Sequence, residues 1–314
     1  MQQRNLGDTS LQTAPIIFGG NIFGWTVDEK RSFELLDAFT DAGFNMIDTA
    51  DSYSRWVPGH KGGESETIIG KWLKQKGNRE KIIIATKVGS DMGNGTDLSA
   101  KHIIASVENS LQRLQTDYID LYQSHYDDLN TPLEETLSAY NDLIGQGKLR
   151  YIGASNLTRE RIEQSLGISK EKGFASYVTL QPLYNLYDRE VFETQYQDFC
   201  RQHNIGVIPY YSLASGFLTG KYRSEKDLSQ STRGGGVKKY LTERGTRILT
   251  ALDRISAAHK ASPAQVALAW LIAQPTISAA IASATSLTQL DDLVKAASLT
   301  LGDNDLNQLD NASK

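Results

Sequence analysis

The chain has 314 residues and a formal net charge of −4, from 33 Lys and Arg against 37 Asp and Glu. This mild acidity excludes the basic surface of a nucleic-acid-binding domain and the polybasic patch of a protein that binds anionic membranes. The hydrophobic fraction of 39% is ordinary for a soluble globular protein. No apolar run approaches the roughly 20 residues that a membrane span requires.

The cysteine and histidine content limits thiol and metal chemistry. The single cysteine, Cys200, excludes an intramolecular disulfide, and the polar start MQQRNLGDTS lacks the apolar core of a secretory signal. Both features favour a cytoplasmic protein. The five histidines contain no pair spaced for metal ligation, so no metal site is expected. Asp127 and Asp128, which follow His125 closely, are expected to be solvated loop carboxylates.

Residues 4–13 predict a β-hairpin with a turn near Gly7-Asp8. Short apolar runs then alternate along the chain with segments of helical periodicity, in which apolar residues recur at spacings such as i, i+4 and i+7. Eight such runs are present, and each one predicts a buried strand. They cover residues 15–20, 44–48, 81–87, 118–125, 149–155, 177–182, 205–210 and 277–283.

Helices are predicted between and after these runs. Ser262-Pro263 indicates a helix start, with serine as the N-cap and proline at the first helical position. Four glycines fall between a helix and the next strand, where a left-handed cap is expected: Gly43, Gly147, Gly173 and Gly206. The helical segments are 28–42, 64–76, 99–114, 132–146, 158–172, 188–203, 243–259, 262–270 and, closing the series, 286–297.

The order of these elements predicts the fold class. Strands that are apolar on both faces, with helices between them, are typical of parallel strands joined by right-handed crossovers. Eight βα units predict an α/β protein with a (β/α)8 TIM barrel, in a single domain covering residues 1–314. The hairpin would plug the barrel from below. The alternative is a doubly wound open sheet, but GGNIFG (19–24) lacks the G-x-G-x-x-G spacing that such a fold would carry.

A long connection at 211–242 follows the seventh predicted strand. Connections of this length are usually functional or disordered. It contains a triple glycine within RGGGVKKY (233–240), which permits either a mobile flap or a merely flexible link.

Polar side chains follow the predicted strands at their carboxyl ends, where barrels of this class build their sites. Asp48 and Tyr53 follow the second strand, Lys87 the third and His125 the fourth. Taken singly, each has an ordinary interpretation as a turn carboxylate, a half-buried aromatic, a surface lysine or a structural histidine. Taken together, they predict one polar cluster at the mouth of the barrel. Asp51, in the same stretch, is expected to be a polar loop residue.

The chemistry of this cluster is coherent. An ammonium beside a tyrosine stabilises the phenolate and lowers the pKa of the hydroxyl, and an aspartate paired with the lysine keeps the lysine charged. A histidine on the far side can donate a hydrogen bond to a carbonyl oxygen. Such a set fits protonation of an oxygen while hydride arrives at its carbon.

The motifs IDTADSY, IATK and LYQSH, which carry Asp48, Tyr53, Lys87 and His125, resemble the catalytic tetrad of the aldo-keto reductase superfamily. The resemblance implies a (β/α)8 barrel that binds NADP(H) across its C-terminal face and reduces aldehydes and ketones to alcohols. Tyr53 would be the general acid, tuned by Lys87 and Asp48, and His125 would orient and polarise the carbonyl group.

GASN (153–156), LQPLYN (180–185) and IPYYSLASGFLTGKY (208–222) are similar to the cofactor-binding segments of that superfamily. The resemblance implies that Tyr210 stacks on the nicotinamide ring. The residues expected to hold the nicotinamide carboxamide are Ser155, Asn156 and Gln181. The residues expected to cover the pyrophosphate are Ser212, Leu213, Gly216 and Lys221.

The 2′-phosphate of NADPH would lie near Ser283, Thr285 and Gln289. None of these three residues is basic, although a phosphate normally recruits Arg or Lys, and Asp291 and Asp292 lie close by in the sequence. NADP(H) is the expected cofactor, with NAD(H) as the alternative.

Trp25, Trp56 and Tyr126 are placed either to line a substrate pocket or to pack the loops, and the first interpretation indicates an apolar or aromatic small-molecule carbonyl substrate. Two other functions stay open. The potassium-channel β subunits are similar to this family and keep the tetrad, so a nucleotide-sensing regulatory subunit is one alternative. A Schiff-base enzyme with Lys87 as the nucleophile is the other. No nucleic-acid or membrane partner is expected, and the oligomeric state stays open.

Overall fold

The computed structural model describes residues 3–232 and 234–314. Its main sheet contains eight parallel strands in the order β10-β3-β4-β5-β6-β7-β8-β9. The strands follow the chain around the sheet, and β10 returns beside β3. Their bounds are β3 (Ile16–Gly19), β4 (Met46–Asp48), β5 (Ile83–Val88), β6 (Ile119–Ser124), β7 (Leu149–Ser155), β8 (Tyr177–Gln181), β9 (Gly206–Val207) and β10 (Ala280–Ala282).

The sheet closes on itself between β9 and the chain that leads into β10. Val207 and Ile277 form a parallel bridge. The backbone N–H of Ser278 then donates to the carbonyl oxygen of Val207 over 2.9 Å. Each predicted apolar run contains one strand of this closed sheet. The (β/α)8 barrel is therefore confirmed, and the doubly wound open sheet is wrong.

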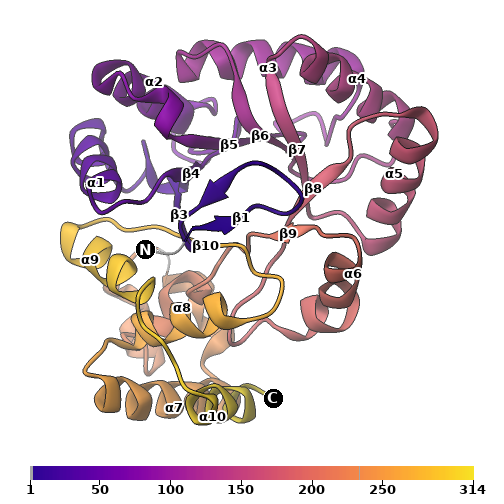
Figure 1. Cartoon of the computed structure of the whole chain (residues 1–314). Coiled ribbons are helices and arrows are strands. Elements are labelled where there is room, and N and C mark those ends of the chain that lie inside the picture. The colour runs from indigo at the N-terminus through magenta and orange to yellow at the C-terminus, as the bar shows by residue number, and fades with distance from the viewer. Residues whose placement is uncertain (1–2, 233) are drawn as a thin grey trace.

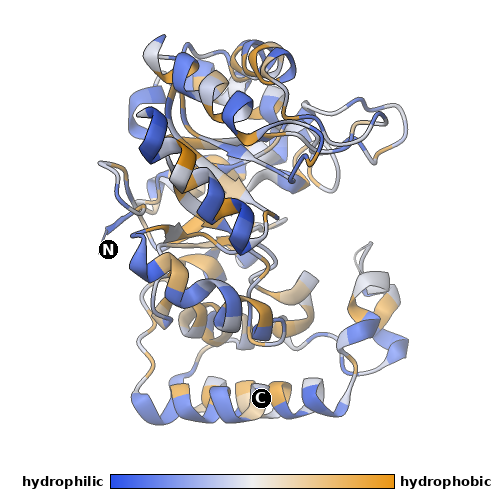
Figure 2. Cartoon of the chain, turned by 90° about the vertical axis from the view of Figure 1, so that its right-hand side faces the viewer, coloured by the Kyte–Doolittle hydropathy of each residue, from blue (hydrophilic) through white to orange (hydrophobic). Residues whose placement is uncertain are grey.

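Helices cover the outside of the strands (Figure 1). In Figure 2 they are striped blue and orange, as expected where one face meets the strands and the other meets water. Several begin at a side-chain cap, and Ser262 accepts from the N–H of Gln265 as predicted. The helices are α1 (Glu29–Asp41), α2 (Glu64–Lys76), α3 (Ala100–Leu114), α4 (Leu133–Gly145), α5 (Arg159–Lys172), α6 (Gln197–Gln202), α7 (Glu243–His259), α8 (Pro263–Ala273), α9 (Leu287–Ala296) and α10 (Asp303–Ser313).

Short helical turns complete the chain. Most are 3₁₀ helices, and the turn that precedes α6 is a π-helix, so the predicted helix over 188–203 is irregular in its first half. They are η1 (Gly20–Ile22), η2 (Arg79–Lys81), η3 (Phe192–Tyr196, the π-helix), η4 (Ala214–Thr219), η5 (Glu225–Gln230) and η6 (Gly234–Tyr240).

The predicted N-terminal hairpin is present and closes one end of the barrel. Strands β1 (Arg4–Asn5) and β2 (Gln12–Thr13) pair antiparallel, and Figure 1 shows them across the near end of the barrel. Leu6 and Leu11 pack into a separate apolar cluster with interior residues of the barrel strands, such as Met46. Gly7 has φ 63°, and a Cβ atom there would lie 2.3 Å from the carbonyl oxygen of Val178. The tight turn of the plug therefore requires glycine.

Two expectations about local structure need correction. Gly206 was expected to cap a helix, but it lies in β9, and Asn204 takes the left-handed conformation at that junction with φ 53°. Helix α10 was not predicted. Its sequence, DNDLNQLDNAS, is rich in Asp and Asn, which are poor helix formers, and its buried Leu309 and Ser313 pack where α10 lies beside α7.

The long connection after β9 consists of η4, η5 and η6. Within η6, Val237 and Tyr240 are fully buried. Residues 234–240 are therefore packed in this structure, and the mobile flap stays a prediction. Arg233, the first residue of that predicted flap, lies outside the described residues.

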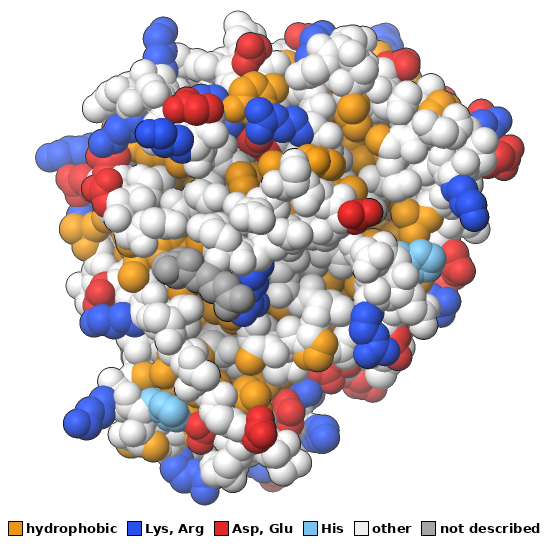
Figure 3. Space-filling model, viewed as in Figure 1, with side chains coloured by type: hydrophobic (Ala, Val, Ile, Leu, Met, Phe, Trp, Pro, Cys, Tyr) orange, Lys and Arg blue, Asp and Glu red, His pale blue; other side chains and the backbone are white. Residues whose placement is uncertain are grey.

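The surface shows no concentration of one charge on the face seen in Figure 3, where Lys, Arg, Asp and Glu are interspersed. Among the described residues, every helix is too short or too polar to cross a bilayer.

Candidate active site

Neighbouring strands deliver the four residues of the predicted cluster to the carboxyl end of the barrel. Asp48 is the last residue of β4, Lys87 is the second-last of β5, and His125 directly follows β6. Tyr53 lies in the turn after β4. Since β4, β5 and β6 are adjacent in the sheet, their carboxyl ends meet, and the structure brings these side chains together.

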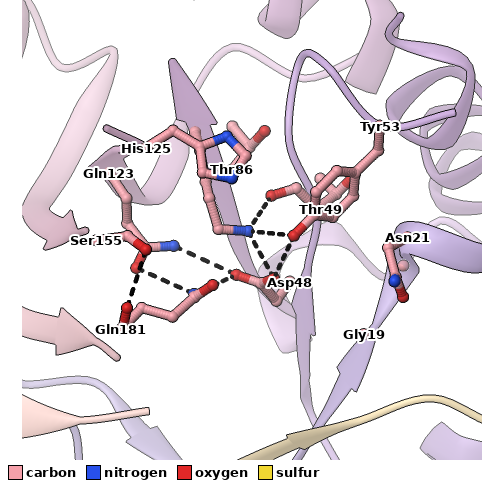
Figure 4. Close-up of polar contacts among 12 residues, drawn as sticks. Gly19, Asn21, Asp48, Thr49, Tyr53, Thr86, Gln123, His125, Ser155 and Gln181 are labelled. Atoms are coloured by element: carbon pink, nitrogen blue, oxygen red, sulfur yellow. Dashed lines mark hydrogen bonds and ion pairs between the residues drawn. The ribbon is translucent and has the colours of Figure 1, made fainter. Parts of the chain in front are cut away.

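The Lys87 ammonium is the centre of the cluster (Figure 4). The side chain is fully buried, and its Nζ donates to Asp48 Oδ2 over 2.7 Å, to the carbonyl oxygen of Thr49 over 2.8 Å and to the hydroxyl oxygen of Tyr53 over 2.8 Å. These three acceptors use all three N–H groups of an ammonium. Lys87 is therefore not a surface lysine, and its pairing with Asp48 is as the sequence predicted.

The second oxygen of Asp48 is held by two side-chain amides. Asp48 Oδ1 accepts from Nε2 of Gln181 over 2.9 Å and from Nε2 of Gln123 over 3.3 Å. A carboxylate that is almost fully buried is stable only when such partners replace the lost water. The aspartate is fixed at both of its oxygens.

The Tyr53 hydroxyl is arranged to keep its proton and to present it to the cavity. Its oxygen accepts from Lys87 over 2.8 Å, and its hydroxyl donates a long hydrogen bond of 3.5 Å to Oδ2 of Asp48 until an acceptor enters the cavity. Burial, followed by the negative charge of Asp48, holds the pKa of Tyr53 well above its usual value of 10. This corrects the expected direction, because burial and Asp48 outweigh the neighbouring ammonium. Tyr53 is a neutral phenol at physiological pH.

His125 completes the cluster as a neutral imidazole. Its ring centroid lies 6.0 Å from that of Tyr53, and its Nδ1 is buried without a hydrogen-bond partner in the described chain. Burial, followed by the charge of Lys87, holds the pKa of His125 well below 6.5. A neutral imidazole carries one N–H, so it can donate one hydrogen bond to an oxygen in the cavity.

The nearby aspartates differ from expectation. Asp51 lies in the loop after β4, as expected, but its Oδ1 is buried without a partner in the described chain. Burial, followed by the charge of Glu66, raises the pKa of Asp51 to about 7. Asp127 forms a two-pronged ion pair with Arg161, and the buried Asp128 accepts the backbone N–H of Leu98 over 3.0 Å. Asp127 and Asp128 therefore anchor loops and are not solvated carboxylates.

A cavity of about 1240 Å³ opens beside the cluster and runs across the carboxyl end of the barrel. Of the four clustered residues, Asp48, Tyr53 and His125 line it, whereas Lys87 lies behind them. All the residues expected to contact cofactor also line it: Ser155, Asn156, Gln181, Tyr210, Ser212, Leu213, Gly216, Lys221, Ser283, Thr285 and Gln289.

At the end nearest the cluster, polar atoms are locked in place around Asn156. Its Nδ2 donates to the carbonyl oxygen of His125 over 2.9 Å and to Oγ of Ser155 over 3.1 Å. Its Oδ1 accepts from the hydroxyl of Tyr210 over 3.0 Å. Asn156 has φ 54°, a conformation that Asn tolerates better than most residues. The Tyr210 ring is thereby anchored at the cavity wall.

Another part of the cavity wall is formed by η4 and carries the positively charged side chain of Lys221. Residues Ala214, Ser215 and Gly216 have φ 49°, 56° and 96° in succession, an unusual run of left-handed conformations. Lys221 lines the cavity without an ion pair to any described residue, and its Nζ lies 4.9 Å from the centroid of the Tyr222 ring. A curved backbone beside an unpaired ammonium suits an anionic group.

The far end of the cavity carries hydroxyl and amide groups. Gln289 Oε1 accepts from the backbone N–H and the hydroxyl of Thr285, over 2.9 and 3.1 Å. Ser283 lies nearer the cluster, because its hydroxyl donates to the carbonyl oxygen of Gly19 over 2.7 Å and Gly19 pairs with Asp48 across β3 and β4. Asp292 also lines this end, where its Oδ1 accepts from Nε2 of Gln265 over 2.6 Å.

Sequence comparisons agree with this site. The model of the aldo/keto reductase family matches residues 15–314. The chain belongs to the aldo/keto reductase family. It is 33% identical to the aldo-keto reductase YhdN of Bacillus subtilis, with 97% of this chain and 91% of YhdN covered. It is 30% identical to Protein tas of Escherichia coli, with 99% and 97% covered.

A third relative carries a different name. This aldo/keto reductase is 32% identical to an Arabidopsis thaliana protein named "Probable voltage-gated potassium channel subunit beta", with 94% of this chain and 91% of that protein covered. Members of the family generally use a nicotinamide cofactor.

Aromatic side chains line the cavity beside Tyr53 and His125 in this aldo/keto reductase. The rings of Trp25 and Trp56 meet edge to face with centroids 5.5 Å apart, and Tyr126 stacks on His125 at 5.0 Å. All three predicted aromatics line the cavity, and Trp56 and Tyr126 are 50% and 43% exposed. These three side chains therefore line the pocket and also pack against neighbouring loop residues.

Two side chains of the site were missed by sequence reasoning. Gln123 binds Asp48, and Asn21, which lines the cavity, accepts from the hydroxyl of Ser283 over 3.0 Å. Gln123 had a detectable signal, because a residue two positions before His125 faces the same side of a strand. Asn21 lies in η1, a turn whose geometry the sequence pattern does not fix.

Proposed function

We propose that this aldo/keto reductase, as a single barrel domain over residues 1–314, reduces aldehydes and ketones to alcohols with NADPH. The observation that carries the proposal is the contact of Lys87 with both Asp48 and Tyr53. It leaves a protonated phenol facing a cavity whose length and lining suit a dinucleotide.

The side chains divide the work around a substrate carbonyl oxygen. Tyr53 gives its proton to that oxygen, and its own oxygen then carries the negative charge. The Lys87 ammonium, 2.8 Å away, stabilises that charge, while Asp48 keeps the ammonium in position. The N–H of His125 orients the carbonyl oxygen. Catalysis of this kind places the donors where charge develops.

The cavity residues fit a nicotinamide dinucleotide, which supplies the hydride when bound. Ser155, Asn156 and Gln181 would hold the carboxamide, and the Tyr210 ring would lie against the nicotinamide ring. Ser212, Leu213 and Gly216 would cover the pyrophosphate, whose charge Lys221 would balance. Ser283, Thr285 and Gln289 would lie near the 2′-phosphate. Neutral donors there support NADPH less strongly than basic residues would, and NADH is the competing cofactor.

A regulatory role is the alternative, and it rests on the relative named as a potassium channel subunit. A Schiff-base mechanism is disfavoured. Lys87 has all three N–H groups engaged and does not line the cavity, so it has no free amine to offer a substrate.

The test is a titration of the protein with NADPH and with NADH, followed by turnover measurements with aliphatic and aromatic aldehydes and ketones. Binding together with steady NADPH oxidation supports the reductase. Binding without oxidation across the whole panel supports the regulatory alternative, and failure to bind either dinucleotide rejects both.

A further inference from the structure

Gln123 is a fully buried polar side chain inside the barrel, at the level of Lys87. The register of the sheet places Lys87 opposite Gln123, Gln123 opposite Gly153, and Gly153 opposite Thr179. Residues paired across parallel strands point to the same face, so this row lies on the inner face of four neighbouring strands, β5 to β8. An uncharged polar residue in such a row must find partners or destabilise the core.

The partners of Gln123 belong to the reaction centre. Its Nε2 donates to Asp48 Oδ1 over 3.3 Å, and its Oε1 accepts from Nε2 of Gln181 over 3.3 Å. The same Nε2 of Gln181 donates to Asp48 Oδ1 over 2.9 Å. Because a carboxylate only accepts, both amides must turn their nitrogen toward Asp48. The three side chains form a closed ring of hydrogen bonds (Figure 4).

The neighbouring strand makes room for this arrangement. A Cβ atom on Gly153 would lie 3.1 Å from Cγ of Gln123 and 2.2 Å from Oγ1 of Thr179. The absence of a side chain at 153 therefore leaves the space that the stem of Gln123 occupies. The row contains a glycine where a larger residue would push Gln123 away from Asp48.

We propose that Gln123 is a positioning residue for the reduction, which holds the Asp48 carboxylate so that its other oxygen directs Lys87 toward Tyr53. This proposal rests on the proposed function and adds a side chain to it. Asp48 Oδ2 binds Lys87, and Lys87 in turn binds the Tyr53 hydroxyl, so any displacement of Asp48 moves the donor that stabilises the phenolate.

Gln181 gives the ring a second connection, toward the cofactor. Its Nε2 is used by Asp48 and Gln123, while its Oε1 makes no hydrogen bond to the described residues, and Gln181 lines the cavity. That oxygen is free to accept from the amide of a nicotinamide. The Asp48 carboxylate fixes which end of the Gln181 amide faces the cavity, so this oxygen stays in place when Gln123 is replaced.

The test compares Gln123→Met with Thr179→Val in steady-state turnover with NADPH. Methionine keeps the length of the side chain and removes its donor. Thr179 lies in the same buried row, its hydroxyl has no partner in the described chain, and it makes no bond to Asp48, so its replacement controls for a change in the barrel interior. Gln123→Met should lower kcat by at least about tenfold, as loss of a hydrogen bond to a charged group does, and leave the NADPH Kd within about twofold.

A second variant works even if Gln123→Met folds poorly. Gln123→Glu can donate to Asp48 only while its carboxyl group is protonated, so its activity relative to the native protein should rise as the pH falls.

A further measurement applies to Gln123→Met itself. Its solvent deuterium isotope effect on kcat should increase, because proton transfer from Tyr53 becomes slower.

The outcomes separate this proposal from the function on which it rests. Turnover in Gln123→Met within about twofold of native, or an equal loss in Thr179→Val, overturns the role of Gln123 and leaves the reductase intact. Absence of turnover in the native protein overturns the reductase, and the role of Gln123 with it.

Discussion

The polar side chains at the two ends of the long cavity differ in how deeply they are buried and in how many partners hold them. At the end near Tyr53, charged groups are buried, and each is held by several partners, as the contacts of Lys87 and Asp48 show. At the far end, Thr285 and Gln289 are exposed and bind chiefly each other. Chemistry requires exact placement of charge, whereas dinucleotide binding tolerates exchange of one polar group for another.

The buried end should therefore be the more sensitive to mutation. Lys87→Met leaves the Asp48 carboxylate without its cation, and the free energy of unfolding should fall by about 3–5 kcal/mol, as it does when a buried ion pair loses one partner. Turnover should fall by at least about 10²-fold because the phenolate loses its stabilising charge. Urea unfolding and single-turnover kinetics measure the two effects.

A double variant tells these effects apart. Adding Asp48→Asn to Lys87→Met removes the unpaired charge, so stability should recover in part while turnover stays low. Recovery of both would mean that the ion pair serves folding alone, and the contrast between the two ends of the cavity would weaken.

The middle of the cavity should show a smaller effect, on binding alone. Lys221→Met should raise the Kd of NADPH by about tenfold, the loss expected for one charge-assisted contact, and leave kcat almost unchanged. The Kd of NADH should rise equally, because both dinucleotides share the pyrophosphate. Fluorescence titration measures both constants. A loss of affinity for NADPH alone would indicate that Lys221 contacts the 2′-phosphate and not the pyrophosphate.

The far end should show a weaker effect that depends on the cofactor. Gln289→Glu keeps the acceptor for Thr285 and replaces the free amide N–H₂ with negative charge. Affinity for NADPH should fall by about fivefold, within the range for one surface hydrogen bond, and affinity for NADH should stay within about twofold. Equal effects on the two dinucleotides would place the 2′-phosphate elsewhere.

The last effect concerns stability beside the buried end rather than turnover or binding. The pKa of Asp51 is raised to about 7, so between pH 4 and pH 7 the folded state binds more protons than the unfolded state and stability falls as the pH rises. Asp51→Asn removes this loss. Its Tm should exceed that of the native protein by several °C at pH 8 and by less at pH 5, as thermal scans at both values would show. A gain that is the same at both pH values would contradict a protonated Asp51.

The sequence predicted the strands and the polar cluster at their carboxyl ends for a physical reason. Strands buried on both faces are continuous apolar runs, and the polar residues that follow them, such as Asp48 and His125, stand out against that background. Gln123 and Asp51 were missed or misjudged because hydrogen bonds between distant segments decide their state. Helix α10 was missed because its stability comes from packing on α7 rather than from its own sequence.

The most direct measurement is the turnover of Tyr53→Phe in parallel with its NADPH affinity, with Tyr126→Phe as the matched control that also loses a cavity hydroxyl. Tyr53→Phe should lower kcat by about 10²- to 10⁴-fold, the usual contribution of a general acid, with NADPH bound as in the native protein. Tyr126→Phe should change kcat by less than about threefold, because Tyr126 makes no bond to Lys87. Near-native turnover in Tyr53→Phe would contradict the account.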